Sequence, residues 1–170
     1  PHTQHHHPTP NTMTNFFDRI LTRSKAINSL LCVGLDPHIN ELNLDKSVNA
    51  NITESDRCDA AYTFCKTIID ATAEYAVAYK PNAAFFEALG PNEGMKTLMR
   101  VSRYIHDTYT DADANTDGLN STCIPILLDC KRGDIGSTAA AYAESSYDHL
   151  YADGVTLSPL MGWDSISPFV

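Results

Sequence analysis

Apolar residues recur along this chain with two different periods, which predict two kinds of element. Short apolar runs rich in branched residues predict buried strands, whereas longer segments with an apolar residue at every third or fourth position predict helices. The predicted strands are residues 30–35, 75–79, 124–129 and 154–157. The predicted helices are residues 14–28, 54–72, 83–89, 92–109 and 137–151, and a further helix is expected to begin near Asp164.

Strands and helices alternate along the chain, and no hairpin turn joins two strands. This order is typical of parallel strands connected by helices. A complete (β/α)8 TIM barrel has about 250 residues. A chain of 170 residues with four strand–helix units therefore corresponds to about half of such an α/β barrel. The pattern by itself also allows a small open, doubly wound sheet.

Charge and composition exclude several classes of protein. The net charge of −9 argues against a nucleic-acid-binding surface. No apolar run approaches the roughly 18 residues that a membrane span needs. Residues 1–13 are rich in His, Pro and Thr and are expected to be disordered, and the acidic loop at residues 111–121 is expected to be mobile. The histidines at residues 5–7 lack an Asp or Cys at ligand spacing, so no metal site is predicted there.

The cysteine pattern indicates reduced thiols. The five cysteines form no Cys-x-x-Cys pair and lie mostly in apolar runs. This pattern is typical of buried thiols in a cytoplasmic protein. Cys130 lies between two charged residues and is therefore considered as a nucleophile. Because strand side chains alternate, its thiol is expected to face away from Asp129 and Lys131, which argues against that role.

Charged residues follow three of the four predicted strands. Asp36 follows the first strand, Lys80 the second, and Asp129 and Lys131 end the third. The carboxyl ends of parallel strands meet at one edge of a sheet, where ligands bind in such folds. A single Asp-x-Lys pair is explained equally well by an ion pair that ties a strand to its loop. Charges at three strand ends favour a ligand site.

Asp134 adds a fifth charge just beyond the third strand. With Lys80, Asp129 and Lys131 it is expected to form a row of alternating charges, in which each charge supports its neighbours. Such a row keeps both lysines protonated inside a pocket, where burial alone lowers the pKa of a lysine.

Four segments resemble the orotidine 5′-phosphate decarboxylase family, particularly its longer microbial and protist type. They are GLDPH at residues 34–38, KPNAAFFEALGP at residues 80–91, LLDCKRGDIGSTA at residues 127–139 and TLSPLMGWDS at residues 156–165. The resemblance extends from about Phe16 to the end of the chain. It implies that residues 14–170 are the N-terminal half of a TIM barrel and that the chain is a fragment. The family's late strands carry a phosphate-binding loop with an arginine, so the fragment alone is expected to be inactive.

The resemblance also implies a reaction, the decarboxylation of orotidine 5′-phosphate to uridine 5′-phosphate in pyrimidine synthesis. Lys131 is expected to stabilise the carbanion that develops at C6 and then to protonate it. Asp129 is expected to face the departing carboxylate, and Lys80 to hold Asp129 and a ribose hydroxyl. No metal or organic cofactor is implied, because the ammonium group supplies the electrostatic stabilisation.

Five further residues take roles from the resemblance. Asp36 and Asn82 are expected to bind ribose hydroxyls. Asp134, Ile135 and Thr138 are expected to reach into the active site of a neighbouring subunit, which implies a homodimer. Neither a nucleic acid nor a membrane is expected as a partner.

Two other interpretations remain open. A Mg²⁺-dependent sugar-phosphate aldolase or decarboxylase of the same superfamily shares the charged triplet Asp129, Lys131 and Asp134. Such an enzyme uses an acidic residue at a strand end where this chain has Asn82. A truncated barrel without catalytic activity is the second alternative, although no basic run near the end of the chain indicates a new binding role. Fusion to an orotate phosphoribosyltransferase, which is frequent in the family, is left undecided.

Overall fold

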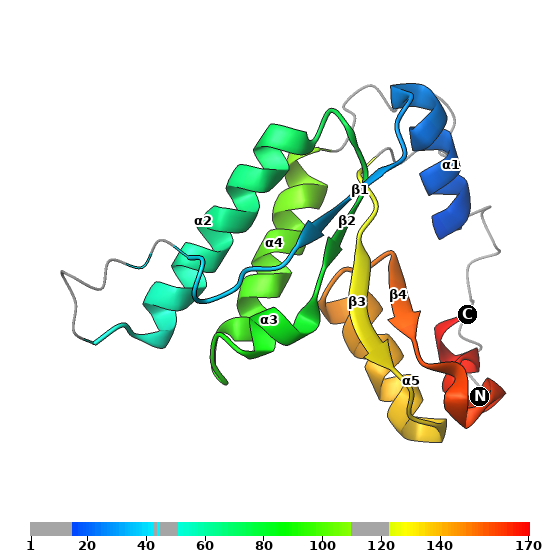
Figure 1. Cartoon of the computed structure of the whole chain (residues 1–170). Coiled ribbons are helices and arrows are strands. Elements are labelled where there is room, and N and C mark those ends of the chain that lie inside the picture. Colours follow the sequence, from blue (N-terminus) through cyan, green and yellow to red (C-terminus); the bar gives the residue numbers. More distant parts are fainter. Residues whose placement is uncertain (1–14, 43, 45–50, 110–122) are drawn as a thin grey trace, which may run out of the picture.

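The computed structural model describes residues 15–42, 44, 51–109 and 123–170 (Figure 1). Its helices are α1 (Phe16–Ile27), α2 (Glu54–Thr72), α3 (Ala83–Glu87), α4 (Gly94–Thr108) and α5 (Gly136–Glu144). Its strands are β1 (Leu31–Leu35), β2 (Ala76–Pro81), β3 (Leu127–Arg132) and β4 (Gly154–Leu157). The predictions of disorder at residues 1–13 and of mobility at residues 111–121 lie outside the described residues.

The four strands form one parallel series. β1 pairs with β2, and β3 pairs with β4, both in parallel. Isolated bridges join Tyr79 to Ile126 and Asn82 to Asp129, so β2 and β3 are neighbours as well. The order β1-β2-β3-β4 follows the chain, as strands do in a (β/α)8 barrel, whereas a doubly wound sheet reverses its strand order.

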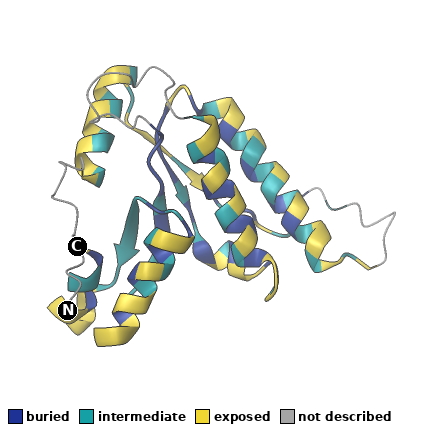
Figure 2. Cartoon of the chain, turned by 180° about the vertical axis from the view of Figure 1, so that it is seen from behind, coloured by how far each residue is buried: buried dark blue, intermediate teal, exposed yellow. Residues whose placement is uncertain are grey.

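Helices α2 and α4 cover one face of the strands. They lie side by side in Figure 1, and Figure 2 shows buried residues concentrated in the strands and on the helix faces turned toward them. The core between them includes Cys65, Ile69, Tyr79, Leu98, Val101, Ile105, Ile126 and Leu128. Burial of this face accounts for the helical spacing of apolar residues in both helices.

Side-chain caps define where the helices begin. Thr53 and Asp56 form a capping box at the start of α2. Asn82 accepts a hydrogen bond from the Ala84 amide at 3.2 Å and caps α3, as the sequence predicts. Because α3 begins directly after β2, this cap also holds the chain at the carboxyl end of that strand.

Helix α1 is attached near the amino ends of the strands. Arg23 donates to the carbonyl oxygens of Ala73 and Ala76, both at 2.8 Å, and Arg19 pairs with Asp153. The helix has the apolar face that its spacing predicts, but none of its residues is buried. This face instead lines an open apolar groove against the strands.

Several predictions about the elements are wrong. β3 spans Leu127–Arg132 instead of residues 124–129, and it begins late because a proline two residues earlier has no N–H group for the ladder. Helix α5 changes into a π-helical turn, Ser145–His149, and Tyr151, with a φ of 58°, ends the helical run. No α-helix begins near Asp164 in the described chain, which has only short 3-10 turns there. Gly162, with a φ of 89°, and two prolines interrupt that segment, so no regular helix follows β4 within the described residues.

The remaining predictions concern the membrane and the thiols. None of the described helices is long and apolar enough to cross a membrane. All five cysteines are free, and Cys58, Cys65 and Cys123 are buried. Cys32 is exposed and departs from the predicted pattern, because its side chain lines the open groove beside α1.

Candidate functional site

Three charged side chains meet where β2 and β3 end. The Lys80 ammonium lies 2.9 Å from Asp129 Oδ2, and the Lys131 ammonium lies 2.5 Å from Asp129 Oδ1. The bridge between Asn82 and Asp129 places the two strand ends side by side. The structure therefore brings together Lys80, Asp129 and Lys131 in one chain.

The backbone of Lys131 departs from strand geometry. Its φ is 48°, in the left-handed region that residues other than glycine rarely adopt. Regular strand alternation predicts the pairing of Lys131 with Asp129. The structure has the same pairing but reaches it through an irregularity in β3. Unusual backbone conformations of this kind cluster at functional sites.

Hydrogen bonds keep Asp129 and Lys80 charged at neutral pH. The bonds from Lys131 and Lys80 hold the pKa of Asp129 well below its usual range, although burial acts to raise it. A hydrogen bond from Thr156 lowers the pKa of Asp129 further. The bond to Asp129 likewise raises the pKa of Lys80 against the effect of burial, and the charge of Asp36 adds to this increase.

The three side chains differ in their access to solvent. The Lys131 side chain is 69% exposed, the Lys80 side chain 32% and the Asp129 side chain 11%. A ligand over the strand ends would therefore meet the Lys131 ammonium first, with the Asp129 carboxylate behind it.

Asp36 and Asn82 contribute polar groups at the ends of β1 and β2. Asp36 Oδ1 is buried and has no hydrogen-bond partner among the described residues. A buried carboxylate oxygen without a donor is costly, and such unpaired atoms are found at functional sites. Asn82 uses its own side-chain oxygen to cap α3.

Within the described chain, Asp134 does not lie against the other three charges, and its expected place in the row stays a prediction. Its Oδ1 accepts a hydrogen bond from the Ile135 amide at 2.8 Å, and no ion pair of Asp134 occurs within the described ranges. β3 ends at Arg132, after which the chain turns toward α5 and carries Asp134 away from the strand ends. Asp134, Ile135 and Thr138 are all exposed around the start of α5.

Thr156 belongs to the cluster, although the sequence analysis assigns it no role. From β4, its hydroxyl donates a hydrogen bond to Asp129 Oδ1 at 2.9 Å. One signal in the sequence could have indicated this role: Thr156 is a polar residue inside an apolar strand. A hydroxyl in such a strand needs a hydrogen-bond partner.

Cys130 is not arranged as a nucleophile. Its side chain packs against the hydrophobic core, and burial raises the pKa of the thiol. The prediction that it faces away from the two charged neighbours agrees with this packing. In the part of the chain that the structure describes, no three His, Cys, Asp or Glu side chains gather closely enough to hold a metal ion.

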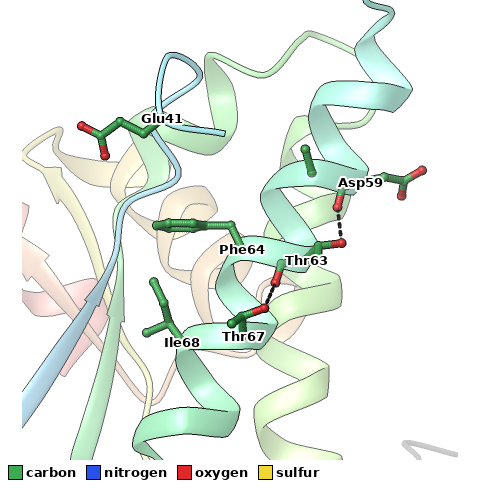
Figure 3. A pocket seen from close by; sticks show the side chains of 7 residues that line it. Glu41, Asp59, Thr63, Phe64, Thr67 and Ile68 are labelled. Atoms are coloured by element: carbon green, nitrogen blue, oxygen red, sulfur yellow. Dashed lines mark hydrogen bonds between the residues drawn. The ribbon is translucent and has the colours of Figure 1, made fainter. Parts of the chain in front are cut away.

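A pocket beside α2 is separate from the charged cluster (Figure 3). Its volume is about 510 Å³, and its lining includes Glu41, Asp59, Phe64 and Ile68. The hydroxyl groups of its two threonines donate to main-chain carbonyl oxygens of the helix, so they are already paired. With two acidic residues and no cationic residue in its lining, this pocket is unsuited to a phosphorylated ligand.

Comparisons with known proteins match the same part of the chain. Residues 29–170 match the Orotidine 5′-phosphate decarboxylase / HUMPS family. The orotidine 5′-phosphate decarboxylase of Leptospira interrogans is 43% identical over 156 residues, which cover 92% of this chain and 49% of that protein. The structure of Leishmania donovani OMP decarboxylase aligns with a TM-score of 0.66 and 42% identity, over 91% of this chain and 48% of that chain. Leishmania donovani UMP synthase aligns with a TM-score of 0.67 and 43% identity, over 93% of this chain and 28% of that chain.

The chain spans about half the length of the curated relatives it matches. Together with the sequential parallel strand order, this coverage identifies the fold as part of a (β/α)8 TIM barrel. The family match includes the ends of all four strands and the charged cluster between them. The chain therefore belongs to the orotidine 5′-phosphate decarboxylase / HUMPS family.

Proposed function

We propose that this chain supplies catalytic strand ends of an orotidine 5′-phosphate decarboxylase and that residues 14–170 form the first half of its barrel. The observation that carries the proposal is the Asp129 carboxylate held between two ammonium groups, at 2.9 Å from Lys80 and 2.5 Å from Lys131. The relatives that cover this region are named for the same activity.

Lys131 stabilises and then protonates the reacting carbon. The bond between C6 of the pyrimidine and its carboxylate carbon breaks, CO₂ leaves, and the electron pair stays on C6. The exposed Lys131 ammonium attracts this developing charge and then transfers a proton to C6, which yields uridine 5′-phosphate. The resulting amine regains its proton from solvent.

Asp129 orients the proton donor. Its charge-assisted hydrogen bond fixes the position of the flexible Lys131 side chain, so less rotational freedom is lost when the transition state forms. With substrate bound, Asp129 also lies beside the leaving carboxylate. We assign the larger effect to Lys131, because its attraction grows as charge builds at C6.

The ribose is held by the groups around this cluster. Asp36, directly after β1, accepts a hydrogen bond from a ribose hydroxyl. Lys80 contacts a second hydroxyl while it holds Asp129, and Asn82 contributes its amide group from the end of β2.

A second copy of the protein completes the site. Asp134, Ile135 and Thr138 are exposed and point to no partner inside the cluster of their own chain. Their proposed place is the substrate site of the neighbouring subunit in a homodimer. There, Asp134 adds a second negative charge to the row formed by Lys80, Asp129 and Lys131.

The test is an activity assay on the full-length protein that contains this chain. Orotidine 5′-phosphate is supplied, and CO₂ and uridine 5′-phosphate are measured with and without a metal chelator. We expect equal turnover in both conditions. Activity that disappears with the chelator contradicts the metal-independent mechanism, and absence of turnover with orotidine 5′-phosphate contradicts the proposed function.

A further inference from the structure

The pairing of β3 with β4 is irregular at the charged cluster. Leu128 pairs with Val155, and the next pair is Arg132 with Leu157. Asp129, Cys130 and Lys131 therefore lie opposite Thr156 alone, where a regular ladder has one residue opposite one. Extra residues of this kind form a bulge, which redirects side chains and is frequent beside active sites.

The Thr156 hydroxyl takes the place of the ladder acceptors that the bulge removes. Its oxygen accepts hydrogen bonds from the Cys130 amide at 3.1 Å and from the Lys131 amide at 3.0 Å. Its proton is donated to Asp129 Oδ1 at 2.9 Å. A hydroxyl has one donor and two acceptor positions, so this single group uses all of them within three consecutive residues of β3.

We propose that Thr156 is a positioning residue for the decarboxylation, an inference that rests on the proposed function. Its bond to the Lys131 amide holds that residue in the left-handed conformation, with its φ of 48°. Its bond to Asp129 fixes the carboxylate oxygen that also receives the Lys131 ammonium. Thr156 thus positions Lys131 both through its main chain and through its side-chain partner.

The three contacts depend on the hydroxyl and not on the shape of the side chain. Valine has nearly the same shape as threonine but can neither accept from the two amides nor donate to Asp129. Serine keeps the hydroxyl and loses only a methyl group. The variants Thr156→Val and Thr156→Ser therefore separate positioning from packing.

Steady-state kinetics of the full-length protein test the proposal. We expect Thr156→Val to lower kcat by about 10- to 100-fold, because a small displacement of a catalytic group has an effect of that size. KM should change by less than about threefold, since the interaction acts on the transition state. Thr156→Ser should retain kcat within about threefold.

A threonine in α4 provides the control. Thr97 is 1% exposed, and its hydroxyl donates only to the Glu93 carbonyl oxygen, at 3.0 Å. Thr97→Val removes the same atom from a more buried position, away from the charged cluster, and should leave kcat unchanged. If Thr156→Val does not fold, the pair Thr156→Ala and Thr156→Ser gives the same comparison, with the alanine variant slower by about 10- to 100-fold.

The outcomes distinguish this proposal from the proposed function. A wild-type protein that does not decarboxylate orotidine 5′-phosphate overturns both. If the wild type is active and Thr156→Val retains kcat, or if serine and valine lower it equally, only the positioning role is overturned. Hydrogen exchange of the Lys131 amide gives a readout without substrate: it should be faster in Thr156→Val than in the wild type, and an unchanged rate contradicts the proposed contact.

Discussion

The most direct test of the site is the replacement of Lys131 by alanine in the full-length protein. In the structure its ammonium lies 2.5 Å from Asp129 Oδ1, and its side chain is 69% exposed over the strand ends. The substitution removes the proposed proton donor and leaves Asp129 paired with Lys80 at 2.9 Å. Because this second pair remains, the strand ends should keep their arrangement, and the loss should fall on the chemical step.

The expected magnitude follows from two effects. An ammonium group about 4 Å from a developing carbanion, with an effective dielectric constant near 20, contributes about 4 kcal/mol, or about a thousandfold in rate. Loss of the positioned acid removes roughly another 10²- to 10⁴-fold. We therefore expect Lys131→Ala to reduce kcat by about 10⁵-fold or more. The affinity for uridine 5′-phosphate should change by less than about tenfold, or about 1.4 kcal/mol.

Single-turnover conversion of orotidine 5′-phosphate measures the chemical step, and calorimetric titration with uridine 5′-phosphate measures binding. Lys66→Ala is the matched control, because Lys66 also lies 2.5 Å from an aspartate, Asp70, but on the outer face of α2. The control should decarboxylate at the wild-type rate. Turnover by Lys131→Ala within tenfold of the wild type would show that another group donates the proton, and the assignment would be wrong.

Three further predictions concern assembly, pH and the isolated chain. An equal mixture of the Lys131→Ala and Asp134→Ala proteins should recover about a quarter of wild-type activity, because half of the dimers are hybrids with one intact site. No recovery despite verified subunit exchange would place Asp134 in its own subunit's site. Burial lowers the pKa of His106, but its interactions with Asp153 and Cys123 together outweigh burial and raise the pKa to about 9. Its stabilising contribution, at most about 3 kcal/mol, should be complete below about pH 6.5 and disappear as the pH rises through about 9. Urea unfolding should show this decline in the wild type and not in His106→Gln, and equal slopes would contradict it. The 170-residue chain expressed alone should self-associate and be inactive. The reasons are that Leu160 and Trp163 are 91% and 66% exposed, and that β1 and β4 are unpaired on one side among the described residues. A monodisperse, active species in size-exclusion chromatography would refute this.

The elements that the sequence predicts well are those whose signals are local. The range 54–72 predicted for α2 matches the structure, because Thr53 and Asp56 cap its start and its apolar face is regularly spaced. The meeting of Lys80 with Asp129 also follows from local information, since it requires only that parallel strands end at one edge. These features depend on periodicity and strand direction, which a single sequence contains.

The features that the sequence does not predict depend on how β3 pairs with its neighbour. Regular alternation accounts for the Asp129–Lys131 pair only by approximation, because the real strand has a bulge that depends on Thr156. The displaced position of Asp134 has the same cause: it depends on where pairing stops and the chain turns. Register and bulges arise from contacts between distant segments, so periodicity along one segment cannot specify them.

The carboxylates at the two ends of the strands have different surroundings. Near the amino ends, both oxygens of Asp153 have donors: Arg19 binds Oδ1, and the Ile126 amide binds Oδ2 at 2.8 Å. At the carboxyl ends, Asp36 Oδ1 is buried without a donor among the described residues, and Lys131 adopts a left-handed conformation. A buried acceptor without a partner and an unfavourable φ both reduce stability. Under the proposed function, bound substrate would change the surroundings of Asp36, and the left-handed conformation would place the Lys131 ammonium beside the reacting carbon. Both costs would then lie at the end of the strands where ligands bind in such barrels.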